Sequence, residues 1–138
     1  MKIGLDIHGT IDRYPAVFSQ LYERWRKSGH EVHIMTGESE VTAHITVESY
    51  NIWSSHFFSI MDYHTELDDV TIFDKKHSVV DMDPHVWNMT KGEYARREGV
   101  DIMFDDSKIY GQFFPTSCTY IRVPDNGLVM HLSMLGVI

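Results

Sequence analysis

The stretch that decides the fold runs from residue 2 to residue 10 and reads KIGLDIHGT. Residues 2–7 are mostly apolar and include β-branched side chains, and His8, Gly9 and Thr10 then break the run. A short apolar run closed by a glycine-containing loop is typical of a buried strand. The stretch therefore predicts a strand that carries the carboxylate of Asp6 to its end.

Strands and helices alternate in the rest of the chain. Pro15 suits a first helical position, and apolar residues at helical spacing follow it until Ser28 and Gly29 stop the helix. Further strands are predicted at 31–35, 57–61, 70–73, 78–81, 100–104 and 118–123, with helices at 39–50, near 84 and at 91–98. The apolar tail from Leu128 fits either a strand or a packed helix. This alternation predicts βαβ units and an α/β fold with a mainly parallel sheet.

The length of the chain predicts one domain over residues 1–138, because a chain of this length buries about two thirds of the surface that it exposes when unfolded. Hydrophobic residues make up 43 % of the chain, enough to fill a core. The formal net charge of −8 argues against an extended nucleic-acid surface, which needs a basic face. A small anionic substrate stays compatible with this charge, because a metal ion can invert the charge locally.

The single cysteine, Cys118, excludes an internal disulfide and fits a reducing compartment. The sequence shows neither the apolar core of a signal peptide nor an apolar stretch of 18 residues. We therefore expect a cytoplasmic protein with no membrane partner. A homo-oligomer is left open.

Polar side chains fall where three of the predicted strands end. Asp6 ends the first strand, Thr36 ends the second, and Asp105 and Asp106 end a later one. In parallel α/β sheets the ligand binds at the carboxyl ends of the strands, near the switch in strand order. We therefore expect these side chains to form one site.

These residue types suit phosphoryl transfer. An aspartate such as Asp6 can form an aspartyl-phosphate, and catalysis then depends on positioning and on electrostatic stabilisation. Carboxylates such as Asp6 and Asp106 are ligands that Mg²⁺ accepts. Lys91 can supply a cation, Thr36 a neutral donor, and Gly9 a close approach of the backbone to the phosphate.

Four segments carry a resemblance to a known family. Residues 6–10 (DIHGT) resemble the first motif of the haloacid dehalogenase-like (HAD) superfamily, Asp-x-Asp-Gly-Thr, and residues 34–37 (IMTG) resemble the second. Lys91, on the helix that leads into the strand ending at Asp105, is similar to the third motif. Residues 104–107 (FDDS) resemble the acidic fourth motif. The motifs come in the family's order and cover residues 1 to about 125.

The resemblance implies a Rossmann-like three-layer α/β/α sandwich with strand order 5-4-1-2-3. It also implies a Mg²⁺-dependent phosphohydrolase with Asp6 as nucleophile. The catalytic residues would be Asp6, His8, Thr36 and Lys91, and the substrate-binding residues Gly9, Thr10, Thr36, Gly37 and Lys91. The Mg²⁺ ligands would be Asp6, Asp106 with Asp105 beside it, and the backbone carbonyl of His8.

The chain departs from the family at His8, which replaces the second aspartate of the first motif. That aspartate usually acts as general acid and then as general base. Imidazole can transfer protons near neutral pH, and a nearby Mg²⁺ would lower its pKa and favour the base role. Two functions follow: a phosphohydrolase acting on phosphomonoesters, or a catalytically weak or inactive module that binds a phosphate or a protein.

The spacing of the motifs predicts a capless or small-cap protein with an open site. The stretch between Asp6 and Thr36 holds one helix and one strand, and the longer stretch before Lys91 leaves room for a small flap within 62–83. Lys75 and Lys76 are alternatives to Lys91 as the site lysine.

The nine histidines include no His-x-x-x-His pair, so the sequence predicts no zinc site.

Overall fold

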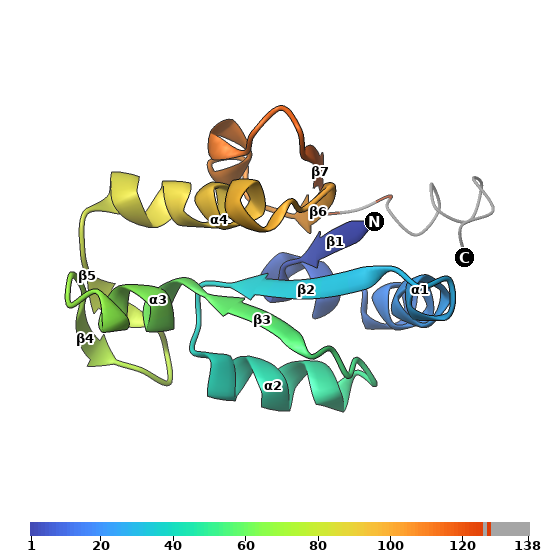
Figure 1. Ribbon diagram of the computed structural model, residues 1–138. Helices are drawn as coiled ribbons and strands as arrows, with labels where there is room; N and C mark the ends of the chain where they lie inside the picture. Colours follow the sequence, from blue (N-terminus) through green and yellow to red (C-terminus); the bar gives the residue numbers. More distant parts are fainter. Residues whose placement is uncertain (126, 128–138) are drawn as a thin grey trace.

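A five-stranded parallel sheet forms the centre of the computed structural model, which describes residues 1–125 and residue 127 (Figure 1). Its strands are β1 (Lys2–Leu5), β2 (Glu31–Thr36), β3 (His56–Ser59), β6 (Ile102–Asp105) and β7 (Thr119–Arg122). The helices are α1 (Pro15–Lys27), α2 (Glu40–Ser49), α3 (Ile60–Glu66) and α4 (Pro84–Glu98), with short turns η1 (Ile7–Ile11) and η2 (Tyr110–Phe113). Strands β4 (Thr71–Asp74) and β5 (Val79–Asp81) form a separate antiparallel hairpin.

The strand order is β3-β2-β1-β6-β7, so the first strand lies in the middle of the sheet. When the five sheet strands are counted along the chain, this is the predicted order 5-4-1-2-3. The structure thus confirms the α/β class, the parallel sheet and its order. The order reverses beside β1, which places a switch point between β1 and β6.

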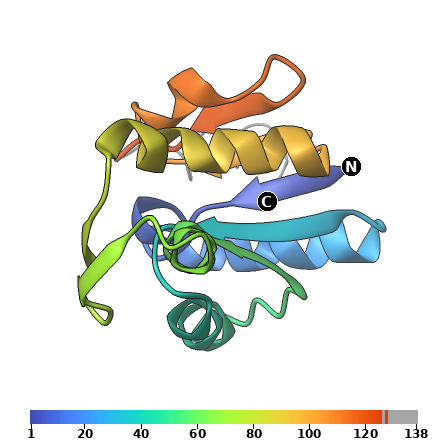
Figure 2. The same ribbon diagram turned by 60° about the vertical axis from the view of Figure 1, so that its left-hand side comes forward.

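Helices cover both faces of the sheet, because side chains of each strand alternate between two cores. Leu5 and Ile34 pack with Phe18 of α1 on one face. Met35 packs with Tyr94 of α4 on the other face. In Figures 1 and 2 the strands β1 and β2 lie between α4 and the pair α1 and α2. The molecule is therefore the expected three-layer sandwich.

Two local predictions were wrong in their boundaries. The strand expected at 57–61 ends at Ser59, because the Ser59 side chain accepts a hydrogen bond from the Asp62 backbone N–H and starts α3. The helices expected near 84 and at 91–98 are one helix, α4, which Gly99 ends in the left-handed conformation. The tail from Leu128 lies outside the described residues.

The hairpin β4–β5 falls within the segment expected to hold a small flap. It lies at the end of the molecule where β1 and β2 finish (Figure 1), and Ser78 in its turn lines the cavity described below. Within residues 1–125, no helix is long and apolar enough to cross a membrane.

Candidate functional site

The carboxyl ends of β1 and β6 bring three carboxylates together. Leu5 pairs with Phe104 across these strands, so the residues that follow, Asp6 and Asp105, emerge side by side. The Asp6 backbone N–H donates to the Phe104 carbonyl at 3.0 Å and holds this alignment. One carboxylate oxygen from each of Asp6, Asp105 and Asp106 lies within 4.8 Å of the other two. The expected acidic site therefore exists in the fold.

Lys91 joins this cluster from α4. Its Nζ lies 2.8 Å from Asp6 Oδ1 and 2.7 Å from Asp105 Oδ2, and its side chain is only 1 % exposed. The alternatives, Lys75 and Lys76, instead line a separate hollow beside the start of α2. Of the three candidate lysines, Lys91 is thus the one that reaches the site.

The cluster carries more negative than positive charge. Burial raises the pKa of Asp6 to about 7; repulsion from Asp105 and Asp106 adds to this, and Lys91 opposes it. One ammonium cannot balance three carboxylates, so the ionised site has an excess of two negative charges. Oxygen ligands with this charge excess fit a hard divalent cation such as Mg²⁺.

The two neighbouring aspartates differ in what they can still bind. Asp105 is fully buried, and its oxygens accept from Lys91 Nζ and from the Ser107 backbone N–H at 2.9 Å. Asp106 is only partly buried and lines the cavity. Of the two, Asp106 is therefore the one that a ligand in the cavity can reach.

Gly9 leaves room for the side chain of Asp106. Its φ is +79°, and a Cβ at this position would lie 2.2 Å from Asp106 Oδ2. The backbone N–H of Gly9 donates to Asp12 Oδ1 at 2.7 Å, which fixes the turn. Neither Gly9 nor Thr10 lines the cavity; Thr10 is fully buried, and its hydroxyl has no hydrogen-bond partner among the described residues.

A cavity of about 340 Å³ opens over the carboxylates. Five of the residues that line it were not predicted: Glu38, Ser78, Trp87, Ser107 and Tyr110. The other lining residues are Asp6, His8, Thr36, Gly37, Lys91 and Asp106, all expected from the sequence. The hydroxyl of Thr36, which is 1 % exposed, accepts from the Glu38 backbone N–H at 3.3 Å.

Two carboxylates hold the imidazole of His8. Its Nε2 lies 3.1 Å from Glu38 Oε2, and its Nδ1 lies 3.2 Å from Asp12 Oδ2. The hydrogen bond to Glu38 raises the pKa of His8 to about 9; Asp12 acts in the same direction, and burial opposes it. This is opposite to the direction expected from a nearby Mg²⁺ alone. The imidazolium form that results can donate a proton.

An aromatic wall closes one side of the cavity. The Trp87 indole N–H donates to the Tyr110 hydroxyl at 3.1 Å, and the Tyr110 ring centre lies 4.9 Å from Lys91 Nζ. Trp87 also packs on Gly37, where a Cβ would lie 3.2 Å from the indole ring. The helical spacing of Trp87 and Lys91, four residues apart on α4, would have placed both on one face.

Comparison of the chain with protein-family models and with curated protein sequences finds no match in either.

Proposed function

We propose that this chain is a Mg²⁺-dependent phosphohydrolase of the HAD-like type, which acts on small phosphomonoesters through an aspartyl-phosphate on Asp6. The observation that carries the proposal is the charge cluster at the ends of β1 and β6. There Asp6, Asp105 and Asp106 lie together, and Lys91 bridges the first two. A buried ammonium between two carboxylates, open to a cavity, suits the binding and transfer of a phosphoryl group.

Asp6 is the nucleophile in this proposal. Lys91 holds its Oδ1, which leaves the second oxygen to attack phosphorus. A bond then forms between Asp6 and phosphorus while the bond to the ester oxygen breaks. The third N–H of the Lys91 ammonium and the Thr36 hydroxyl donate to the phosphoryl oxygens.

His8 transfers the protons. It is held as imidazolium by Glu38 and Asp12, and in the reaction its Nε2–H turns from Glu38 to the leaving alkoxide and gives that oxygen its proton. The neutral imidazole then takes a proton from water, which attacks the aspartyl-phosphate and releases inorganic phosphate. Asp6 and Asp106, with the backbone carbonyl of His8, would hold Mg²⁺, which supplies charge neutralisation when it is bound.

The cavity favours a small substrate. Its volume of about 340 Å³ suits a phosphate with a compact alcohol, and Trp87 and Tyr110 offer a flat apolar wall to that alcohol. The net charge of −8 speaks against an extended nucleic-acid partner. The single cysteine is compatible with a protein that is located in the reducing cytoplasm.

The test is phosphate release from a panel of phosphomonoesters, with Mg²⁺ or with EDTA. We expect Mg²⁺-dependent release that Asp6→Asn abolishes. Asp68→Asn is the matched control, because Asp68 is exposed with φ of +56°, a conformation that asparagine adopts readily. Acid quenching followed by mass spectrometry should find the phosphoryl group on Asp6.

Two results would contradict the proposal. Asp6→Asn that retains full activity would exclude Asp6 as nucleophile. Absence of release from every ester, together with saturable binding of inorganic phosphate, would instead support the phosphate-binding module.

A further inference from the structure

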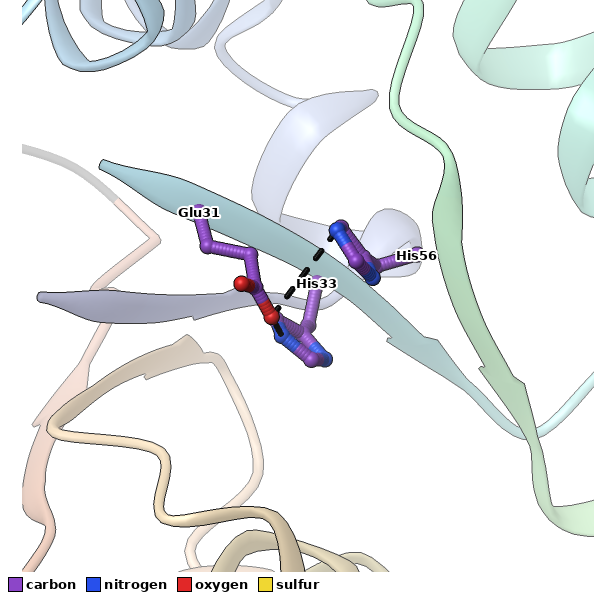
Figure 3. A group of neighbouring side chains, drawn as sticks. All are labelled: Glu31, His33 and His56. Carbon is purple, nitrogen blue, oxygen red and sulfur yellow. Dashed lines mark hydrogen bonds and ion pairs between the residues drawn. The ribbon is translucent and has the colours of Figure 1, made fainter. Parts of the chain in front are cut away.

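A second group of ligand atoms lies at the other end of the sheet. It consists of Glu31 and His33 from β2 and His56 from β3 (Figure 3). The parallel register pairs His33 with His56, and Glu31 precedes His33 by two residues, so all three side chains lie on one face. One ligand atom from each lies within 4.8 Å of the others. Thr36, at the far end of β2, belongs to the carboxylate site and follows His33 by three residues, which is about 10 Å along the strand at roughly 3.3 Å per residue.

His33 is already oriented as a metal ligand would be. It is 2 % exposed, and its Nδ1 lies 2.6 Å from the Tyr94 hydroxyl of α4. Its Nε2 points toward Glu31, with Oε1 at 2.5 Å. A metal-ligating histidine usually gives its second ring nitrogen to an oxygen that fixes the tautomer, and Tyr94 supplies that oxygen here.

We propose that Glu31, His33 and His56 bind a divalent transition-metal ion, with Zn²⁺ the best match. Two imidazoles and one carboxylate are a set that Zn²⁺ accepts, with water as the fourth ligand. The sequence argued against zinc because these histidines are far apart along the chain. Strand pairing brings them together.

Only the exposed members of the group have to move. A tetrahedral Zn²⁺ with bonds of about 2.0–2.1 Å places its ligand atoms roughly 3.3 Å apart. The distance from His56 Nε2 to Glu31 Oε1 is 3.8 Å, which is longer than this value. The distance from His33 Nε2 to the same oxygen is 2.5 Å, which is shorter. The Glu31 and His56 side chains are 37 % and 44 % exposed, so they can adjust around the fixed His33. Both also line an open cavity, from which water can reach the ion.

Lys2 competes with the ion. Its Nζ lies 3.9 Å from Glu31 Oε1 and donates to the Glu98 carbonyl at 2.8 Å. A metal at Glu31 would be repelled by this ammonium. Removing the Lys2 charge should therefore tighten metal binding, an effect that a purely structural Glu31–His33 contact would not produce.

Metal binding would secure an edge of the sheet. β3 is the outermost strand beside β2, and His56 is its first residue. An ion shared by Glu31, His33 and His56 would link the edge strand to β2 and, through Tyr94, to α4. The binding should appear as higher thermal stability, because a ligand that binds the folded state stabilises it.

The experiment titrates Zn²⁺ into the full chain after EDTA treatment, with excess Mg²⁺ present to occupy the carboxylate site. Calorimetry should show one Zn²⁺ per chain and a rise in melting temperature. We expect His56→Asn to weaken binding at least tenfold, and Lys2→Gln to strengthen it. His77→Asn is the matched control, because His77 is exposed in the β4–β5 turn beside Asp74 and far along the chain from this group.

His33→Asn risks unfolding because His33 is buried, so the half-exposed His56 carries the test. Asp6→Asn should leave Zn²⁺ binding intact, which separates this proposal from the phosphohydrolase proposal. Equal binding by the wild type and His56→Asn, or no saturable Zn²⁺ binding, would overturn the inference.

Discussion

Replacing Lys91 by methionine tests the charge balance of the carboxylate site. The Lys91 ammonium contacts Asp6 at 2.8 Å and Asp105 at 2.7 Å, and all three side chains are at least nine-tenths buried. Methionine keeps much of the volume but leaves two buried carboxylates facing each other. Removing one partner of a buried ion pair costs about 3–5 kcal/mol. A domain of this size is stable by about 5–15 kcal/mol, so the variant should fold with a large loss of stability.

The assay is urea unfolding in EDTA, which keeps divalent cations from compensating. Adding Asp105→Asn to Lys91→Met should recover about 1–3 kcal/mol, because one of the two facing charges is then gone. The Asp105 Oδ1 that accepts from the Ser107 N–H is kept by asparagine. A loss below about 1 kcal/mol in Lys91→Met, or no recovery in the double variant, would refute this account of the cluster.

Three further predictions concern single positions. Gly9→Ala should destabilise the chain by about 1–3 kcal/mol and remove the Mg²⁺-induced rise in melting temperature, because its Cβ would collide with Asp106; thermal denaturation with and without Mg²⁺ checks this. Trp87→Ala should raise KM for an aryl phosphate about two- to tenfold, from an aromatic contact of roughly 0.5–1.5 kcal/mol, and leave KM for glycerol phosphate nearly unchanged in steady-state assays. Burial raises the pKa of the Cys118 thiol to about 11, so the stability that the protonated thiol contributes is complete below about pH 9 and is lost as the pH rises through 11. Alkylation of Cys118 at pH 8 should accordingly be slow in the native protein and fast in urea.

The main elements were predictable because each rests on a local pattern. Pro15 and the apolar spacing after it define α1, and the observed helix begins at that residue. The second helix was expected to begin at Ser39, and the Ser39 side chain does cap it by accepting from the Thr42 backbone N–H. Asp6 and Asp105 were expected together because parallel strands end at one edge of the sheet. These predictions need only the spacing of apolar residues within a segment and the rules by which helices connect the strands of a parallel sheet.

The remaining features depend on which strands become neighbours. Ile60 and Met61 begin α3 although the apolar run 57–61 predicts a strand, because a short buried run fits either structure. Glu31, His33 and His56 show the same limit: the spacing of Glu31 and His33 places two ligands on one strand face, but His56 joins them only through the β2–β3 register. A search for close pairs along the chain cannot detect that arrangement.

The neighbours of His8 explain why an imidazole suits this position better than the aspartate of the motif that residues 6–10 resemble. An aspartate at this position would face the carboxylates of Glu38 and Asp12, which now lie 3.1 and 3.2 Å from the imidazole nitrogens. Three carboxylates there would repel one another beside a cluster that already has excess negative charge. Glu38 is only 7 % exposed, so it cannot turn away into water. The imidazolium of His8 therefore offsets part of the negative charge of Glu38 and Asp12, and replacing it by an aspartate in His8→Asp should slow a phosphohydrolase reaction rather than speed it.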